Sequence, residues 1–150
     1  MTITAEEISR EKDRLPRGWG RFGKTLDKLA ELSQADESLV STCVALNPTF
    51  EHKTVTLVGG LLEMTKTTNV VLAATSERLL MVGTGFGGAP RAESSIPYDG
   101  LEVVSSSDKE FVLQWPDAAM RVRGGHKKQV PEFIAAVTAR ARPNDGGTTP

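Results

Sequence analysis

Apolar and polar residues alternate through much of the chain between residues 39 and 123, and this pattern predicts a β-sheet protein. Successive side chains of a strand point to opposite faces, so an apolar residue at every second position is typical of a half-buried strand. Turn residues divide the region into the strands 39–46, 70–75, 78–83, 92–97, 101–105, 111–115 and 120–123. Short turns join most of these strands, which predicts antiparallel pairing.

A helix is expected near the N-terminus, over residues 4–15. Thr4 followed by Glu7 forms a capping box, in which each side chain bonds the other residue's backbone N–H. Ile3 and Ile8 can pack together across this start as a hydrophobic staple. Few apolar residues follow, so we expect the helix to be exposed or partly frayed.

Two further helices are predicted by apolar residues at spacings of three and four. The first covers 19–34, and its apolar stripe includes Trp19 and Phe22. That stripe is expected to pack on the sheet or on a neighbouring subunit, and the alternative is a helix that lies on a membrane surface. The second covers 130–142 and accepts Pro131 in its first turn, where the missing N–H has no intrahelical partner.

These elements predict a single mainly β (α+β) domain with one core, because 150 residues is close to the commonest domain size. A seven-stranded antiparallel sheet followed by an amphipathic helix can curl into a partly open barrel or sandwich, with the helix covering an open end. The chain is then divided into an N-terminal helical extension at 1–37, a barrel domain at 38–142 and a disordered tail at 143–150.

The segment 49–68 is compatible with two structures. It contains the run VTLVGGLLEM at 55–64, which is apolar on both sides of a glycine pair and is flanked by Lys53 and Lys66. Either the run is an ordinary strand, bent at the glycines, whose leucines belong to the core. Or it is a glycine-tipped loop that inserts its apolar side chains into a bilayer interface or a partner's groove.

The composition indicates a globular protein and argues against a general nucleic-acid-binding protein. A hydrophobic fraction of 39% and a charged fraction of 25% are those of a globular protein. Eighteen Lys and Arg against nineteen Asp and Glu argue against sequence-independent nucleic-acid binding, which needs a basic face. The single cysteine, Cys43, allows no intramolecular disulfide and lies in an apolar run typical of a buried thiol. The chain has no apolar run of about 18 residues and no signal-peptide core, so a cytoplasmic location is expected.

Two motifs resemble the bacterial pleckstrin-homology-like domains. One is the hairpin T-x-x-R-L-L at 75–80, followed by a glycine-rich turn, and the other is the strand end I-P-Y-x-x-I, here I-P-Y-x-x-L at 96–101. The residues that carry them are Thr75, Arg78, Leu79, Leu80, Ile96, Pro97, Tyr98 and Leu101. The resemblance covers about 39–142 and implies a seven-stranded, partly open barrel capped by the C-terminal helix. It also implies a family that is generally non-catalytic and prone to homo-oligomerise. The apolar segment 49–68 departs from the family pattern.

The glycine-rich run at 83–88 matches G-x-G-x-x-G, the pattern of dinucleotide-binding loops. A dinucleotide site needs this motif between a strand and a helix, so that the helix N-terminus meets the pyrophosphate. Here a further strand follows the motif. The run is therefore interpreted as a hairpin turn.

The two histidines and the cysteine belong to no recognisable catalytic or metal-binding motif. His52 and His126 are far apart in sequence, and neither has ligands at metal-binding spacing or a nucleophile in a recognisable motif. We therefore expect no enzyme activity, no metal and no cofactor.

A local basic run lies between the last strand and the C-terminal helix. It consists of Arg121, Arg123, His126, Lys127 and Lys128. Such a run can hold a phosphate or an acidic peptide beside a helix N-terminus. The alternative is a solvated strand face and turn.

The expected function is non-enzymatic binding or assembly through protein–protein contacts, with self-association. The residues expected to contact a partner are Val55, Leu57, Leu61, Leu62, Trp19 and Phe22. The alternative function is peripheral binding to an anionic membrane, with Lys53, Lys66, Lys127 and Lys128 facing the lipid headgroups.

Overall fold

The structure is a computed structural model that describes residues 2–52, 67–85, 89–116 and 118–143. Its described helices are α1 (Ala5–Asp13), the 3-10 helix η1 (Gly20–Phe22), α2 (Gly23–Leu32) and α4 (Val130–Arg140). Its described strands are β1 (Leu39–Leu46), β2 (Thr49–His52), β3 (Asn69–Thr75), β4 (Arg78–Thr84), β5 (Pro90–Pro97), β6 (Glu102–Ser106), β7 (Phe111–Trp115) and β8 (Ala118–Val122).

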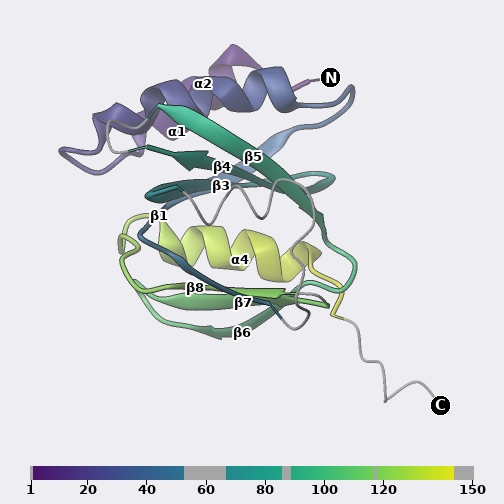
Figure 1. The fold of residues 1–150 in the computed structure, drawn as a ribbon. Coiled ribbons are helices and arrows are strands. Elements are labelled where there is room, and N and C mark those ends of the chain that lie inside the picture. The colour runs from purple at the N-terminus through teal and green to yellow at the C-terminus, as the bar shows by residue number, and fades with distance from the viewer. Residues whose placement is uncertain (1, 53–66, 86–88, 117, 144–150) are drawn as a thin grey trace.

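The strands form two antiparallel sheets of four strands each, so the mainly β class is confirmed. Sheet A has the order β1-β3-β4-β5 and sheet B the order β2-β8-β7-β6 (Figure 1). The expected seven strands are corrected to two sheets with eight strands in the described residues, which form no closed barrel.

The additional strand is β2, which the sequence pattern left unplaced. Asn47 adopts a left-handed backbone with φ of 47°, a conformation that asparagine tolerates, and the chain bends there before Pro48. The bend carries the chain from β1 in sheet A to β2, which pairs with β8 in sheet B. The possible strand within 54–64 lies outside the described residues.

The main core lies between the two sheets and includes α4. This helix runs between the sheets in Figure 1 and buries Val130, Phe133, Ile134 and Val137. The rings of Phe133 and Phe111 on β7 are 5.9 Å apart. The predicted C-terminal helix, with a proline in its first turn, is confirmed.

A second apolar cluster lies on the other face of sheet A, under α1 and α2. Phe22, Leu26 and Leu29 pack there on sheet A. Both faces of β3 and β4 are therefore buried, which explains why these strands are almost continuously apolar in sequence.

The first helix is docked on the protein, although the sequence predicted that it would be exposed or frayed. The capping box between Thr4 and Glu7 is confirmed, and Ile3 and Ile8 are both buried in the second cluster. Glu11 is also buried, with 1% of its surface exposed, and it accepts a hydrogen bond from β1. Polar contacts of this kind hold α1 on the protein although the helix has few apolar residues.

The T-x-x-R and I-P-Y motif residues hold the segments around the β3–β4 hairpin together. Arg78 donates from Nε to Glu37 Oε2 (3.0 Å) and from Nη2 to Leu32 O (2.8 Å). Thr75 Oγ1 lies 2.7 Å from the same Glu37 oxygen, and Tyr98 OH donates to Thr75 O (2.6 Å). Burial raises the pKa of Tyr98 to about 12, so its hydroxyl keeps the proton that it donates. These residues connect the end of α2 to β3, β4 and the end of β5.

Candidate functional site

The two edges of sheet A differ in whether their backbone groups have partners. Along β1, three N–H groups that point away from the sheet are bonded by side chains. Leu39 N–H donates to Glu7 Oε2 (2.8 Å), Thr42 N–H to Glu11 Oε1 (2.9 Å) and Val44 N–H to Gln129 Oε1 (3.0 Å). The β1 edge is therefore closed to an added strand.

The opposite edge is β5, which pairs only with β4 among the described strands. Backbone groups of alternate residues in an antiparallel strand point to opposite neighbours. The backbone N–H groups of Thr42 and Val44 point away from β3. The registers place Ser95 in line with Thr42, and Glu93 in line with Val44, across β3 and β4. The backbone N–H and C=O of Glu93 and Ser95 therefore point outward, away from β4. No hydrogen bond joins these two N–H groups to another described residue. This edge is open to strand addition within the described part of the chain.

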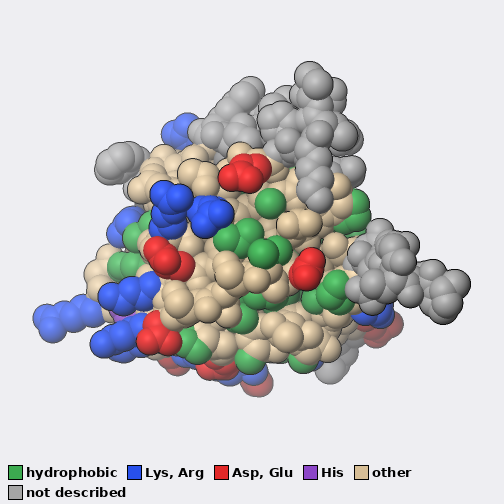
Figure 2. All heavy atoms as spheres, turned by 90° about the horizontal axis from the view of Figure 1, so that it is seen from below, with side chains coloured by type: hydrophobic (Ala, Val, Ile, Leu, Met, Phe, Trp, Pro, Cys, Tyr) green, Lys and Arg blue, Asp and Glu red, His purple; other side chains and the backbone are tan. Residues whose placement is uncertain are grey.

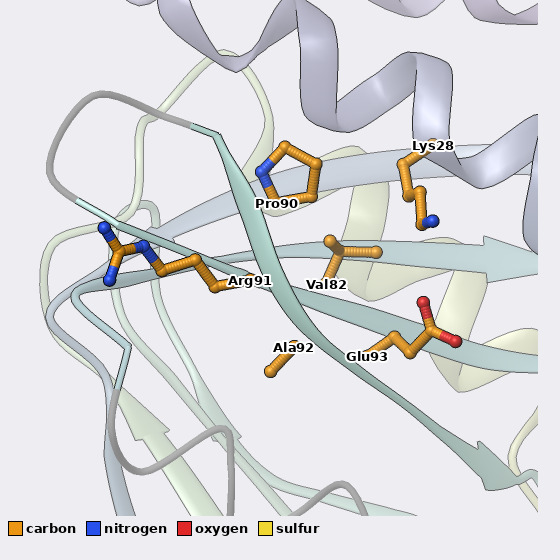
Figure 3. Close-up of a pocket in the computed structure, with 6 residues that line it drawn as sticks. All are labelled: Lys28, Val82, Pro90, Arg91, Ala92 and Glu93. Atoms are coloured by element: carbon orange, nitrogen blue, oxygen red, sulfur yellow. The ribbon is translucent and has the colours of Figure 1, made fainter.

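A groove runs beside this edge, between α2 and β5. Its first cavity, of about 210 Å³, is lined by Lys28, Val82, Pro90, Arg91, Ala92 and Glu93. The second, of about 310 Å³, shares Glu93 and is lined by Leu32, Arg78, Leu80, Ser94 and Ser95. In Figure 3 the side chains of Lys28 and Glu93 point toward one another across the first cavity. The groove therefore combines charged side chains with serine hydroxyls.

Arg91 points away from Lys28 in Figure 3, toward the end of β4. A Cβ atom built on Gly85 would lie 2.5 Å from Arg91 Nε, so a larger residue at this position would require the exposed arginine side chain to move. Gly85 N–H donates to Ala89 O (3.2 Å) as the chain turns from β4 into β5. The prediction that the glycine-rich run joins two strands is confirmed, with residues 86–88 outside the described part.

The structure brings Trp19 to the basic run, although more than one hundred residues separate them in sequence. The Trp19 and His126 rings are 5.3 Å apart and nearly perpendicular. Lys127 and Lys128 act electrostatically on the His126 imidazole, and both are exposed, as is Arg123. Figure 2 shows basic side chains gathered along one side of the molecule as seen from sheet B. An aromatic ring next to several cations is a surface that suits an anionic partner.

His126 is neutral at neutral pH in this setting. Desolvation lowers the pKa of its imidazole, and the nearby positive charges of Lys128, Lys127 and Lys109 lower it further. The Lys128 N–H donates to His126 Nδ1 (3.1 Å), which orients the ring. The positive charge of this surface therefore comes from Lys and Arg.

Phe22 was expected to contact a partner, and the structure corrects this. Its ring is fully buried in the second cluster under α2, with Arg21 stacked 4.5 Å from the ring centre. The stripe of apolar residues on α2 faces sheet A, because packing on the sheet removes the apolar side chains from water. Trp19, at the margin of the cluster, is half-buried.

Of the remaining predicted site residues, Arg121 lies on sheet B and the others lie outside the described residues. Arg121 is exposed on the outer face of sheet B, where it pairs in register with Thr49 and Val112. The predicted loop residues Lys53, Val55, Leu57, Leu61, Leu62 and Lys66 lie outside the described residues.

The sequence analysis missed the roles of two sets of residues at the edges of sheet A: the glutamates that bond the β1 edge and the outward residues of β5. Glu7 and Glu11 are four residues apart, so they share one helix face, and this spacing could have indicated a common partner. Nothing in the local sequence marks Glu93 or Ser95 as edge residues, because the end of a sheet is set by tertiary pairing.

In the described residues, no group of three or more His, Cys, Asp or Glu side chains is placed to hold a metal ion. Cys43 is buried, and this burial raises the pKa of its thiol to about 12. None of the described helices has the length and apolar character needed to cross a bilayer.

Comparisons of this chain with protein-family models, with curated proteins and with solved structures found no match.

Proposed function

We propose that this chain is a non-enzymatic binding and assembly module that acts through protein–protein contacts at the β5 edge, with a second copy of the chain as the partner. The observation that carries the proposal is the contrast between the two edges of sheet A. Side chains satisfy the outward N–H groups of β1, whereas those of Glu93 and Ser95 on β5 have no such partner in the described residues. Strand addition to an exposed edge is a common mode of protein recognition.

The proposal includes a pleckstrin-homology-like, partly open barrel as the fold. Its support is the arrangement of two four-stranded antiparallel sheets with a C-terminal helix between them. The motif residues Thr75, Arg78 and Tyr98 have framework roles, which is what a fold signature requires. A site for partners would then lie on the surface of the framework, separate from the motif.

A two-fold axis at Ser94 gives the pairing that we propose between two copies. In this antiparallel register, Glu93 of one copy lies opposite Ser95 of the other, and the two residues exchange N–H···O=C bonds reciprocally. Each Ser94 then faces its counterpart across the axis. The two Glu93 carboxylates are not directly opposite each other, which avoids the repulsion of like charges in cross-strand pairs.

Prolines limit the length of the paired segment. Pro90 and Pro97 bound β5 and donate no backbone N–H, so an added strand has the window 91–96. Proline near the end of an edge strand is a known device against uncontrolled aggregation. The resulting contact is a closed dimer with one short strand pair.

The Ser95→Pro variant is expected to weaken dimerisation by about 5- to 150-fold. Its lost N–H points away from β4, so the substitution removes two intermolecular hydrogen bonds from each dimer and none from the sheet itself. Two bonds at about 0.5–1.5 kcal/mol each contribute about 1–3 kcal/mol to association. Sedimentation equilibrium over a range of concentrations measures the change.

Three further variants serve as a control and as a test of the register. Ser95→Ala keeps the N–H and should dimerise as the unmodified protein does. Ser94→Cys should form an intermolecular disulfide, and Ala92→Cys should not; Cys43 is buried and does not interfere. A protein that stays monomeric at high concentration, or a dimer that Ser95→Pro leaves unchanged, would remove the proposal.

A second candidate function is peripheral binding to anionic membranes, and the contact between Trp19 and His126 favours it. That contact gathers an aromatic side chain with Lys127 and Lys128 on one surface. Such a combination can place an indole at the level of the headgroups and cations beside their phosphates.

For this second candidate, the Lys127→Glu/Lys128→Glu variant is expected to bind vesicles rich in phosphatidylserine at least about 30-fold more weakly than the unmodified protein, because two cations are lost and two anions are added. Each cation near an anionic surface contributes about 1 kcal/mol. Vesicle sedimentation at low salt measures binding, and Trp19 fluorescence reports contact. Arg140→Glu/Arg142→Glu, at the other end of α4, is the matched charge control. Equal binding by both variants, or no pelleting of the unmodified protein, would dismiss this candidate.

A further inference from the structure

The helix α1 is attached to the rest of the protein mainly by polar contacts. Only Ile8 within the helix, and Ile3 just before it, place apolar side chains in the second cluster. No residue of α1 belongs to the main core between the sheets. The apolar contribution of α1 to stability is therefore small compared with that of α4, which buries four apolar side chains.

The polar contacts of α1 follow the outer edge of β1. Glu11 Oε1 accepts from the Thr42 N–H (2.9 Å) and lies 3.0 Å from Thr42 Oγ1. Glu7 Oε2 accepts from the Leu39 N–H, and Arg10 Nη2 donates to Leu39 O (3.1 Å). These side chains occupy the positions that the C=O and N–H groups of a neighbouring strand would take.

Ion pairs provide the other links of α1. Glu11 Oε2 lies 3.4 Å from Arg10 Nε and 3.6 Å from Arg14 Nη1, which balances its buried charge. Arg14 also bonds Glu132 on α4 with N–O distances of 3.0 and 2.5 Å. Lys12 Nζ lies 2.8 Å from Asp27 on α2. The pairs with Glu132 and Asp27 are solvent-exposed, and such pairs are weak and screened by salt.

We propose that α1 is a detachable guard of the β1 edge: it opens as a unit of its own while the two sheets and α4 stay folded. In the closed state its carboxylates satisfy the Leu39 and Thr42 N–H groups. In the open state these two N–H groups lose their partners, and this part of the β1 edge is exposed on the side of sheet A opposite β5. The inference is independent of the β5 dimer, because it concerns the other edge of the sheet.

Hydrogen exchange of the unmodified protein tests the proposal within one strand. The amides of Leu39 and Thr42 depend on α1, that of Val44 depends on Gln129, and the register directs those of Cys43 and Ala45 to β3. We expect Leu39 and Thr42 to exchange at least about tenfold faster than Cys43 and Ala45, at rates close to those of the α1 amides. Equal exchange of all four β1 amides would show that α1 opens only when sheet A unfolds, and would overturn the proposal.

A pair of matched variants gives a second test. Glu7→Ala/Glu11→Ala removes both carboxylates from the edge, and Glu6→Ala/Asp13→Ala removes two exposed carboxylates of the same helix. The first variant should lose protection at Leu39 and Thr42 about tenfold and become sensitive to trypsin at Arg10, Lys12 and Arg14. Protection within β3 and β4 should stay unchanged in both. Loss of β3 and β4 protection together with β1 would contradict an independent guard, and if the first variant fails to fold, exchange in the unmodified protein decides.

Discussion

Replacing Arg78 by leucine is expected to lower the free energy of unfolding by about 3–5 kcal/mol, because it leaves the Glu37 carboxylate buried without its cationic partner. Glu37 is fully buried, and Arg78 Nε donates to its Oε2 at 3.0 Å. The same guanidinium bonds Leu32 O at the end of α2. Denaturation by urea measures the loss, and Glu77→Gln, an exposed change in the same hairpin, is the control.

The effect of Arg78→Leu should depend on pH in a defined direction. Burial by itself raises the pKa of Glu37, but hydrogen bonds from Arg78, Thr75 and Gln34 and the Arg78 charge outweigh burial and lower it. The stabilisation by the pair is then fully present above the unfolded pKa of about 4.3 and is lost as pH falls through the lower folded pKa. The difference between the unmodified protein and the variant should therefore be largest above about pH 5 and shrink in acid. A difference that grows in acid would contradict this assignment.

Replacing Phe22 by alanine is expected to lower the free energy of unfolding by about 3–5 kcal/mol, the usual cost of a buried phenylalanine. The ring is completely buried between α2 and sheet A, and alanine would leave a cavity among Leu26, Leu29 and their neighbours. The tryptophan fluorescence of the chain provides a probe of unfolding in denaturant.

Trp19→Ala is the informative comparison, since Trp19 is the other residue of this stripe expected to meet a partner. It is half-buried, so its loss should cost less stability than that of Phe22. Under the membrane hypothesis, Trp19→Ala should weaken vesicle binding while leaving the fold intact. A Phe22→Ala protein as stable as the unmodified one would show that α2 does not pack on sheet A as described.

Much of the fold could be predicted from local pattern. The alternation at 111–115 and the i, i+3, i+4 spacing on α4 set which faces are apolar, and the structure buries those faces. The capping box at Thr4 was also predictable, because it depends on residues three apart. The strand β2 was not, because four residues beyond a bend carry too little periodicity to identify a strand.

The candidate sites were less predictable than the fold. Trp19 and the basic run were recognised separately, and no sequence pattern could show that Trp19 and His126 are in contact. The sequence predicted that Phe22 would contact a partner, whereas the structure buries it against sheet A. The pattern could not distinguish the two, because an apolar stripe is the same whether it packs on a sheet or on a partner. The structural roles of Thr75 and Arg78 depend on Glu37 and Leu32, which only the tertiary structure brings beside them, and that of Tyr98 depends on Thr75.

Local sequence was sufficient for the properties that depend on neighbours along the chain: the mainly β class, most strands, the C-terminal helix and the strand-to-strand turn at the glycine-rich run. The tertiary structure alone decided which strands form the edges of sheet A, and that α1 covers β1 while the described residues leave β5 open. The physical reason is that each backbone N–H needs a partner, and the partner of an edge strand comes from residues distant in sequence. Glu93 and Ser95 acquire their significance from their position at the end of the sheet.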